Sequence, residues 1–170
     1  MSVVATLPLL GRYARLLDRL LAELKDQYGG RLVAAAVFGS VGRGTVREDS
    51  DVDLLIVARD LPARRVRRLE EFLPVESRLA AALRAVRSDG VPITLSPVFK
   101  TPAETEQGSP LFFDVVEEAR ILHDPESFLA RYLGRLRARL RELGARRVWL
   151  GNAWYWELKP DLKPGEVIAL

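Results

Sequence analysis

Hydrophobic residues recur every three or four positions in two long segments of the chain. The first segment, residues 9–28, predicts an amphipathic helix that ends at the glycine pair 29–30. The second, residues 126–143, predicts another amphipathic helix with leucines and aromatic residues on one side. Arginines at i, i+4 spacing line a different side of this second helix: Arg131, Arg135 and Arg139.

Two continuous apolar runs, residues 32–38 and 52–58, indicate strands that are buried on both faces. Two more strands are predicted at 92–99 and 120–122. Proline and capping patterns predict helices between the strands, and Pro74 divides the first helical region in two. These helical segments are 62–72, 75–87, one that begins at the capping box 101–104, and 110–119. The order predicts an α/β (α+β) fold, a mixed β-sheet packed with helices.

The composition limits the class of protein. A chain of 170 residues, nearly half of them apolar, suits one domain with a small addition. It has no run of 18 apolar residues and no signal-peptide pattern, so we expect a cytoplasmic protein that does not enter the membrane. The absence of cysteine excludes disulfides and thiolate sites, and a single histidine, His123, argues against a zinc site.

The net charge of +3 conceals a strong preference for arginine, which provides 22 of the 26 basic residues. Together with very few Asn, Gln and Met residues, this pattern favours a thermophilic source. Basic stripes on the predicted helices suit a solvated face best and a protein partner next. Nucleic acid is a third possibility that we do not favour, because no RNA- or DNA-binding pattern of interleaved aromatic and basic residues is present.

Residues 39–57 carry the most specific chemical pattern. Asp51 and Asp53 are two residues apart at the start of an apolar strand, so their side chains point to the same face. Adjacent carboxylates repel unless a proton or cation lies between them, and hard oxygen ligands of this kind suit Mg²⁺. Upstream, a Gly-Ser turn at Gly39 and Ser40 follows the first strand and can present backbone N–H groups to phosphate oxygens.

Three groups of residues together resemble the signature of the DNA-polymerase-β-like nucleotidyltransferase superfamily: Gly39-Ser40, Arg43-Gly44 and Ser50-Asp51-Val52-Asp53-Leu54. The nearest group is the small minimal nucleotidyltransferases of prokaryotes, here archaeal or thermophilic. The resemblance is close over residues 30–60 and extends in layout over 12–125. It implies a nucleotidyltransferase domain at 1–125, with residues 126–170 forming a C-terminal helix and an aromatic tail packed on the same domain.

By this resemblance the protein moves an NMP group from an NTP, with ATP favoured, to a hydroxyl of a protein or small molecule. Asp51 and Asp53 would be the catalytic ligands of Mg²⁺ or Mn²⁺, and Gly39 and Ser40 would hold the β- and γ-phosphates. The remaining motif residues have less defined roles. Arg43 could reach a phosphate or form a surface ion pair, Gly44 is conformational, and Ser50 orients Asp51 or the loop, or contacts substrate.

The chain departs from the family in its third strand, where active members usually carry another carboxylate. Segment 92–99 contains no acid, and Thr94 and Ser96 are the positional candidates. Glu104 is better explained by its capping box, and Asp114 by a solvated helix face. Either another acid substitutes, or catalysis is slow, or the protein binds NTP without turning it over. The last case gives the alternative function, a degenerate, antitoxin-like regulator of a HEPN-type helical partner.

The C-terminal segment is rich in aromatic residues, with Trp149 followed by Trp154, Tyr155 and Trp156. Prolines at 160 and 164 prevent a long helix there. We expect these aromatic residues to anchor the tail onto its own domain, with partner docking or stacking on a base as alternatives. Whether the protein forms a homo-oligomer is left open.

Overall fold

The two continuous apolar runs form the centre of the sheet in the computed structural model, which describes residues 3–151, 153–163 and 166. Strands β1 (Leu32–Phe38) and β2 (Val52–Ala58) pair antiparallel. Strand β3 (Leu95–Lys100) runs parallel to β2, and β4 (Arg120–His123) runs antiparallel to β1, giving the order β3-β2-β1-β4. This arrangement confirms the predicted mixed sheet, and both central strands are buried on both faces as expected.

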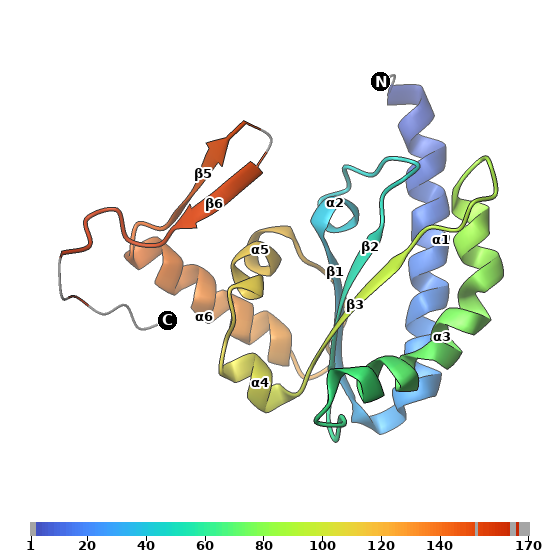
Figure 1. The fold of residues 1–170 in the computed structure, drawn as a ribbon, viewed down its shortest axis with the longest axis horizontal. Helices are drawn as coiled ribbons and strands as arrows, with labels where there is room; N and C mark the ends of the chain where they lie inside the picture. The colour runs from blue at the N-terminus through green and yellow to red at the C-terminus, as the bar shows by residue number, and fades with distance from the viewer. Residues whose placement is uncertain (1–2, 152, 164–165, 167–170) are drawn as a thin grey trace.

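Helices cover both faces of the sheet, so the protein has two apolar layers (Figure 1). On one face lie α1 (Val3–Tyr28) and α3 (Arg65–Val86), and a short 3₁₀ turn (Gly29–Arg31) links α1 to β1. On the other face lie α5 (Leu111–Glu118) and α6 (Phe128–Glu142). Two short helices, α2 (Gly39–Gly42) and α4 (Pro102–Glu106), follow β1 and β3.

Several predicted boundaries were wrong. Helix α1 begins at Val3 rather than at residue 9, and α3 begins at Arg65 rather than at residue 62. The region around Pro74 is a single helix, α3, which bends along its length in Figure 1. Its buried stripe continues on both sides of Pro74, from Phe72 to Val75, while the proline ring itself is exposed, so packing holds the helix together across the missing hydrogen bond. Strand β3 begins at Leu95 rather than at residue 92.

The aromatic tail contains a hairpin that the pattern analysis did not predict. Strands β5 (Arg146–Leu150) and β6 (Ala153–Glu157) pair antiparallel, with Trp149 opposite Trp154 and Arg147 opposite Trp156. Trp156 packs against the apolar layer under α5 and α6. Within the described residues, no helix combines the length and the apolar character needed to span a membrane.

Candidate active site

Asp53 and Gly39 lie in direct contact where β1 ends and β2 begins. Phe38 pairs with Asp53 across the two strands, so the residue that follows Phe38 meets the Asp53 carboxylate. A Cβ atom on Gly39 would lie 2.3 Å from Oδ2 of Asp53, and Gly39 has φ +64°, a conformation that favours glycine. The Gly-Ser turn therefore faces the carboxylate of Asp53 only because residue 39 has no side chain.

Asp51 lies next to Asp53, just before β2. Its Oδ1 accepts a hydrogen bond from the backbone N–H of Thr94 at 3.3 Å, and the side chain is exposed. Burial raises the pKa of Asp53, and the charges of Asp51 and Glu118 raise it further, while Arg43 lowers it. Two neighbouring carboxylates repel each other, and their oxygens are hard ligands. Such a pair suits a divalent cation that takes its other ligands from water and phosphate.

The loop between the Gly-Ser turn and the aspartates is held by its own hydrogen bonds and by α1. The N–H of Arg43 donates to the Gly39 carbonyl at 3.0 Å, and the N–H of Arg47 donates to Ser50 Oγ at 2.8 Å. From α1, the Tyr13 hydroxyl donates to the Ser50 carbonyl at 2.6 Å, and burial is the main cause that raises its pKa to about 12. Ser50 therefore orients this loop, which is one of the roles expected for it.

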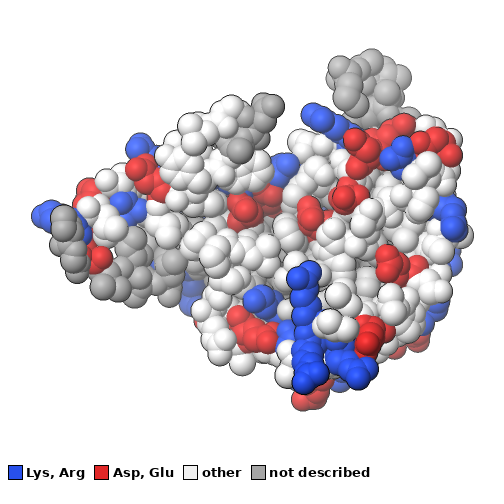
Figure 2. Space-filling view, viewed as in Figure 1, with Lys and Arg blue, Asp and Glu red and all other residues white. Residues whose placement is uncertain are grey.

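An ion-pair cluster that the sequence analysis missed lies beside the aspartates. Glu118, at the end of α5, forms ion pairs with Arg43 at 2.6 Å and with Arg147 of β5 at 2.7 Å. Only 5% of Glu118 is exposed. Acidic side chains are visible around the notch between the β5–β6 hairpin and the end of the sheet next to α2 (Figure 2). Arg43 therefore forms an ion pair, but with a buried acid rather than a surface one.

Asp114 joins the hairpin to α5, so the interpretation of this residue as part of a solvated face was wrong. Its Oδ1 accepts hydrogen bonds from the indole N–H groups of Trp154 at 3.2 Å and Trp156 at 3.0 Å, and from Arg147 at 3.1 Å. These hydrogen bonds attach Trp154 and Trp156 to α5. Trp149 differs, because it is 60% exposed.

The third strand offers no carboxylate to the site. Ser96 is the register partner of Asp53 on β3, and Thr94 contributes its backbone to Asp51 and Val52. Glu104 closes the capping box with Thr101, as expected. In the part of the chain that the structure describes, no group of three or more Asp, Glu or His residues could hold a metal ion.

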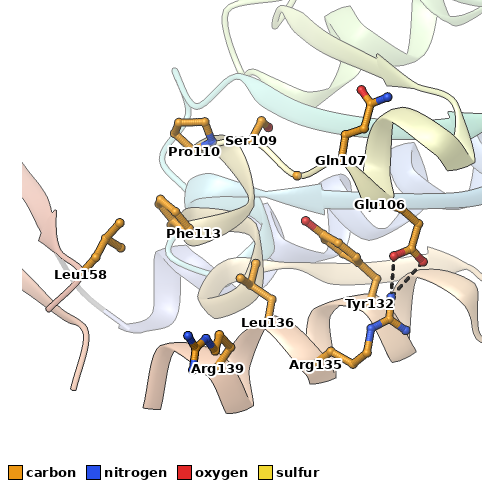
Figure 3. A pocket seen from close by; sticks show the side chains of 11 residues that line it. Glu106, Gln107, Ser109, Pro110, Phe113, Tyr132, Arg135, Leu136, Arg139 and Leu158 are labelled. Atoms are coloured by element: carbon orange, nitrogen blue, oxygen red, sulfur yellow. Dashed lines mark hydrogen bonds and ion pairs between the residues drawn. The ribbon is translucent and has the colours of Figure 1, made fainter. Parts of the chain in front are cut away.

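A cavity of about 530 Å³ lies elsewhere, between the α4–α5 connection and α6 (Figure 3). Phe113, Tyr132 and Leu136 provide apolar walls, and Arg135 at its rim pairs with Glu106 at 2.7 Å. None of the motif residues from Gly39 to Asp53 lines it. The cavity is therefore separate from the two aspartates.

Asp53 therefore faces the Gly-Ser turn at the start of a central strand, with Asp51 beside it. The model of the nucleotidyltransferase domain family matches residues 17–126. The chain belongs to this family, and its enzyme class is nucleotidyltransferase. The match begins within α1, spans the sheet and helices α2 to α5, and ends before the β5–β6 hairpin.

Three similar proteins illustrate the relationship. MJ1305 of Methanocaldococcus jannaschii, provisionally named a protein adenylyltransferase, is 31% identical over 130 residues, covering 75% of this chain and 83% of that protein. MntA of Thermococcus cleftensis, named a protein adenylyltransferase, is 39% identical over 61 residues, or 36% of this chain and 54% of that protein. A crystal structure of a toxin–antitoxin with AMP-PNP aligns with a TM-score of 0.47 and 18% identity, over 75% of this chain and 92% of the solved one.

Proposed function

We propose that this nucleotidyltransferase moves AMP from ATP to a hydroxyl group of a protein. The contact between Asp53 and Gly39 is the observation that supports the site, because it places a carboxylate against the Gly-Ser turn at the start of β2. The names of the two relatives, both protein adenylyltransferases, support ATP as the donor and a protein as the acceptor.

In the proposed reaction the acceptor hydroxyl oxygen attacks the α-phosphorus of ATP and its proton passes to solvent. The bond from the α-phosphorus to the oxygen that bridges to the β-phosphate breaks, and pyrophosphate leaves. Asp51 and Asp53 would hold Mg²⁺ or Mn²⁺, whose positive charge stabilises the charge that develops on the phosphate oxygens. Gly39 and Ser40 would hold the β- and γ-phosphates, and Arg43 would supply a guanidinium to them. Gly44 and Ser50 would keep the intervening loop in shape.

Transfer of label from [α-³²P]ATP tests this proposal, with Mg²⁺ or Mn²⁺, on the protein alone and in host-cell extract. Competition by each unlabelled NTP reports the base preference. We expect a metal-dependent labelled protein that disappears in Asp53→Asn and in the double variant with Asp51→Asn. Asp49→Asn is the matched control, because Asp49 is an exposed acid in the same loop. Unchanged transfer by the double variant would refute the assignment of both aspartates.

The alternative function is binding without turnover, in which the protein holds an NTP and regulates a HEPN-type helical partner. The serine at the register position next to Asp53 favours it, since a hydroxyl is a poorer metal ligand and a weaker base than a carboxylate. Calorimetry distinguishes the two functions. ATP binding that depends on Asp53, with no labelled product under any condition, would support the regulator, whereas turnover that Asp53→Asn abolishes would exclude it.

A further inference from the structure

Glu118 is a buried carboxylate that no step of the proposed reaction uses. It forms ion pairs with Arg43 of the motif loop and with Arg147 of the hairpin. An isolated charge in such a place is strongly unfavourable, and the two guanidinium groups compensate the buried carboxylate. Oε1 of Glu118 and Nε of Arg147 make no hydrogen bond within the described residues, so this ion pair depends more on charge than on aligned hydrogen bonds.

The cluster is attached to the active site through the backbone. A Cβ atom on Gly42 would lie 2.2 Å from the Glu118 carbonyl oxygen and 2.9 Å from that of Val37. The helical turn α2, which follows the Gly-Ser pair, is therefore pressed against the end of α5. Because the Glu118 charge also acts on Asp53, the carboxylate lies within electrostatic reach of the candidate metal ligands.

The two arginines differ in their freedom to move. The side chain of Arg43 is 38% exposed, whereas that of Arg147 is 19% exposed. Arg147 is also held by Asp114, and its guanidinium lies over the rings of Trp154 and Trp156, at 5.1 Å and 5.3 Å from their centroids. Of the pair, only Arg43 is placed to exchange one anionic partner for another.

A triphosphate in the proposed site would compete with Glu118 for Arg43. If Arg43 turned to the phosphates and Glu118 had no other partner, a buried carboxylate would be left uncompensated, which is strongly unfavourable. Arg147 remains in place and removes most of this cost. The hairpin, which lies beyond the residues matched by the family model, thus provides a charge that the motif loop needs.

We propose that Arg147 is a positioning residue for nucleotide binding, which neutralises Glu118 and so allows Arg43 to turn to the triphosphate. The inference rests on the proposed function, since it assumes that ATP occupies the site beside Arg43. It assigns the β5–β6 hairpin a part in ATP affinity.

Calorimetry of ATP binding with Mg²⁺, together with the kcat and KM for transfer, tests this role in the full chain. We expect Arg147→Gln to weaken ATP binding about tenfold and to raise KM more than it lowers kcat. Arg147→Lys keeps the charge and should bind ATP within about threefold of the wild type. Arg146→Gln is the matched control, because Arg146 is the adjacent residue of β5 and pairs with Glu157 instead.

The double variant Glu118→Gln/Arg147→Gln separates electrostatics from folding. When residue 118 carries no charge, Arg43 can turn to the triphosphate without breaking an ion pair. The ATP affinity should therefore return to within about threefold of the wild type. Equal ATP affinity in Arg147→Gln and Arg146→Gln, or no recovery in the double variant, would overturn the proposal. Binding without transfer by the wild type would contradict only the proposed reaction, and absence of ATP binding would contradict both.

Discussion

At the scale of single residues, the site depends on how closely Gly39 approaches Asp53. Gly39 and Gly44 both have positive φ, at +64° and +71°, so both resist substitution on conformational grounds. Only Gly39 also faces a side chain, since a Cβ atom there would lie 2.3 Å from the Asp53 carboxylate, whereas nothing lies within 4 Å of one on Gly44. Comparing the same substitution at the two glycines therefore distinguishes the effect of backbone strain from the effect of displacing the Asp53 carboxylate.

Gly39→Ala should displace the Asp53 carboxylate and lower ATP binding and transfer by at least about tenfold, because the oxygen and the new methyl group cannot both keep their places. Gly44→Ala should cost only the backbone strain, about 1 kcal/mol of unfolding free energy, with little change in ATP affinity. Urea unfolding and calorimetry measure the two effects. Equal ATP affinity in both variants would show that the Asp53 contact has no role in binding.

At the scale of elements, the β5–β6 hairpin is attached to α5 by the carboxylates of Asp114 and Glu118 and by apolar packing of Trp156. Asp114 lies on α5 and accepts hydrogen bonds from three side chains of β5 and β6 through one oxygen. The sheet, by contrast, is held by continuous backbone pairing and by an apolar layer on each face. The hairpin should therefore be able to open locally while the sheet remains folded.

Asp114→Ala should release the hairpin, because two indole N–H groups and a guanidinium lose their acceptor. We expect faster hydrogen exchange at the amides of β5 and β6, unchanged exchange in β1 and β2, and a loss of about 1–2 kcal/mol of unfolding free energy. Glu117→Ala is the control, since Glu117 is exposed on the same helix. Unchanged exchange in the hairpin would mean that the Glu118–Arg147 ion pair and the apolar packing of Trp156 hold it instead.

At the scale of the whole molecule, an ion pair between Arg68 and Glu104 joins α3 to α4. Arg68 donates to both carboxylate oxygens of Glu104 at 2.7 Å, and also to the Phe99 carbonyl of β3 at 3.2 Å. Only 8% of Arg68 is exposed. Hydrogen bonds from Arg68, and then from the Thr101 N–H, lower the pKa of Glu104 to about 2, although burial opposes them.

This pair should make stability depend on pH in acid. The pKa of Glu104 is lower in the folded state than its unfolded value of 4.5, so its ionised form stabilises the folded protein fully above pH 4.5. This contribution is lost as the pH falls to about 2. We expect Glu104→Gln to lower the unfolding free energy by about 2 kcal/mol at pH 7, after allowance for partial exposure of Glu104. The difference from the wild type should shrink between pH 4.5 and pH 2.

Urea unfolding at a series of pH values measures this dependence. Glu106→Gln serves as the control, because Glu106 pairs with Arg135 on the surface and should change stability by less than about 0.5 kcal/mol. If the unfolding free energies of Glu104→Gln and the wild type differed by the same amount from pH 7 to pH 2, the ionised Arg68–Glu104 pair would not be the source of the lost stability.

Features that depend on near neighbours in the chain could be predicted from the order of the amino acids alone. Continuous apolar runs determined the two central strands, because only a strand covered on both faces accepts such a run. The Thr101–Glu104 capping box and the glycine stop after residue 28 are formed by residues only a few positions apart. The grouping of Gly39, Asp51 and Asp53 could also be predicted from the sequence. Side chains two residues apart on a strand point to the same face, and Gly39 lies in the turn after the preceding strand.

Which distant groups meet depends on how the whole chain folds. Glu118 pairs with Arg43 and Arg147, and Asp114 with the tryptophans of β6, across separations that no local pattern reports. Pro74 led to the prediction of two helices, but packing of the buried side chains keeps α3 continuous. The β5–β6 hairpin forms in a segment where apolar and polar residues do not alternate long enough to predict strands. Local backbone preferences are a property of the chain alone, but the cost of burying a charge depends on the partner that folding brings to it.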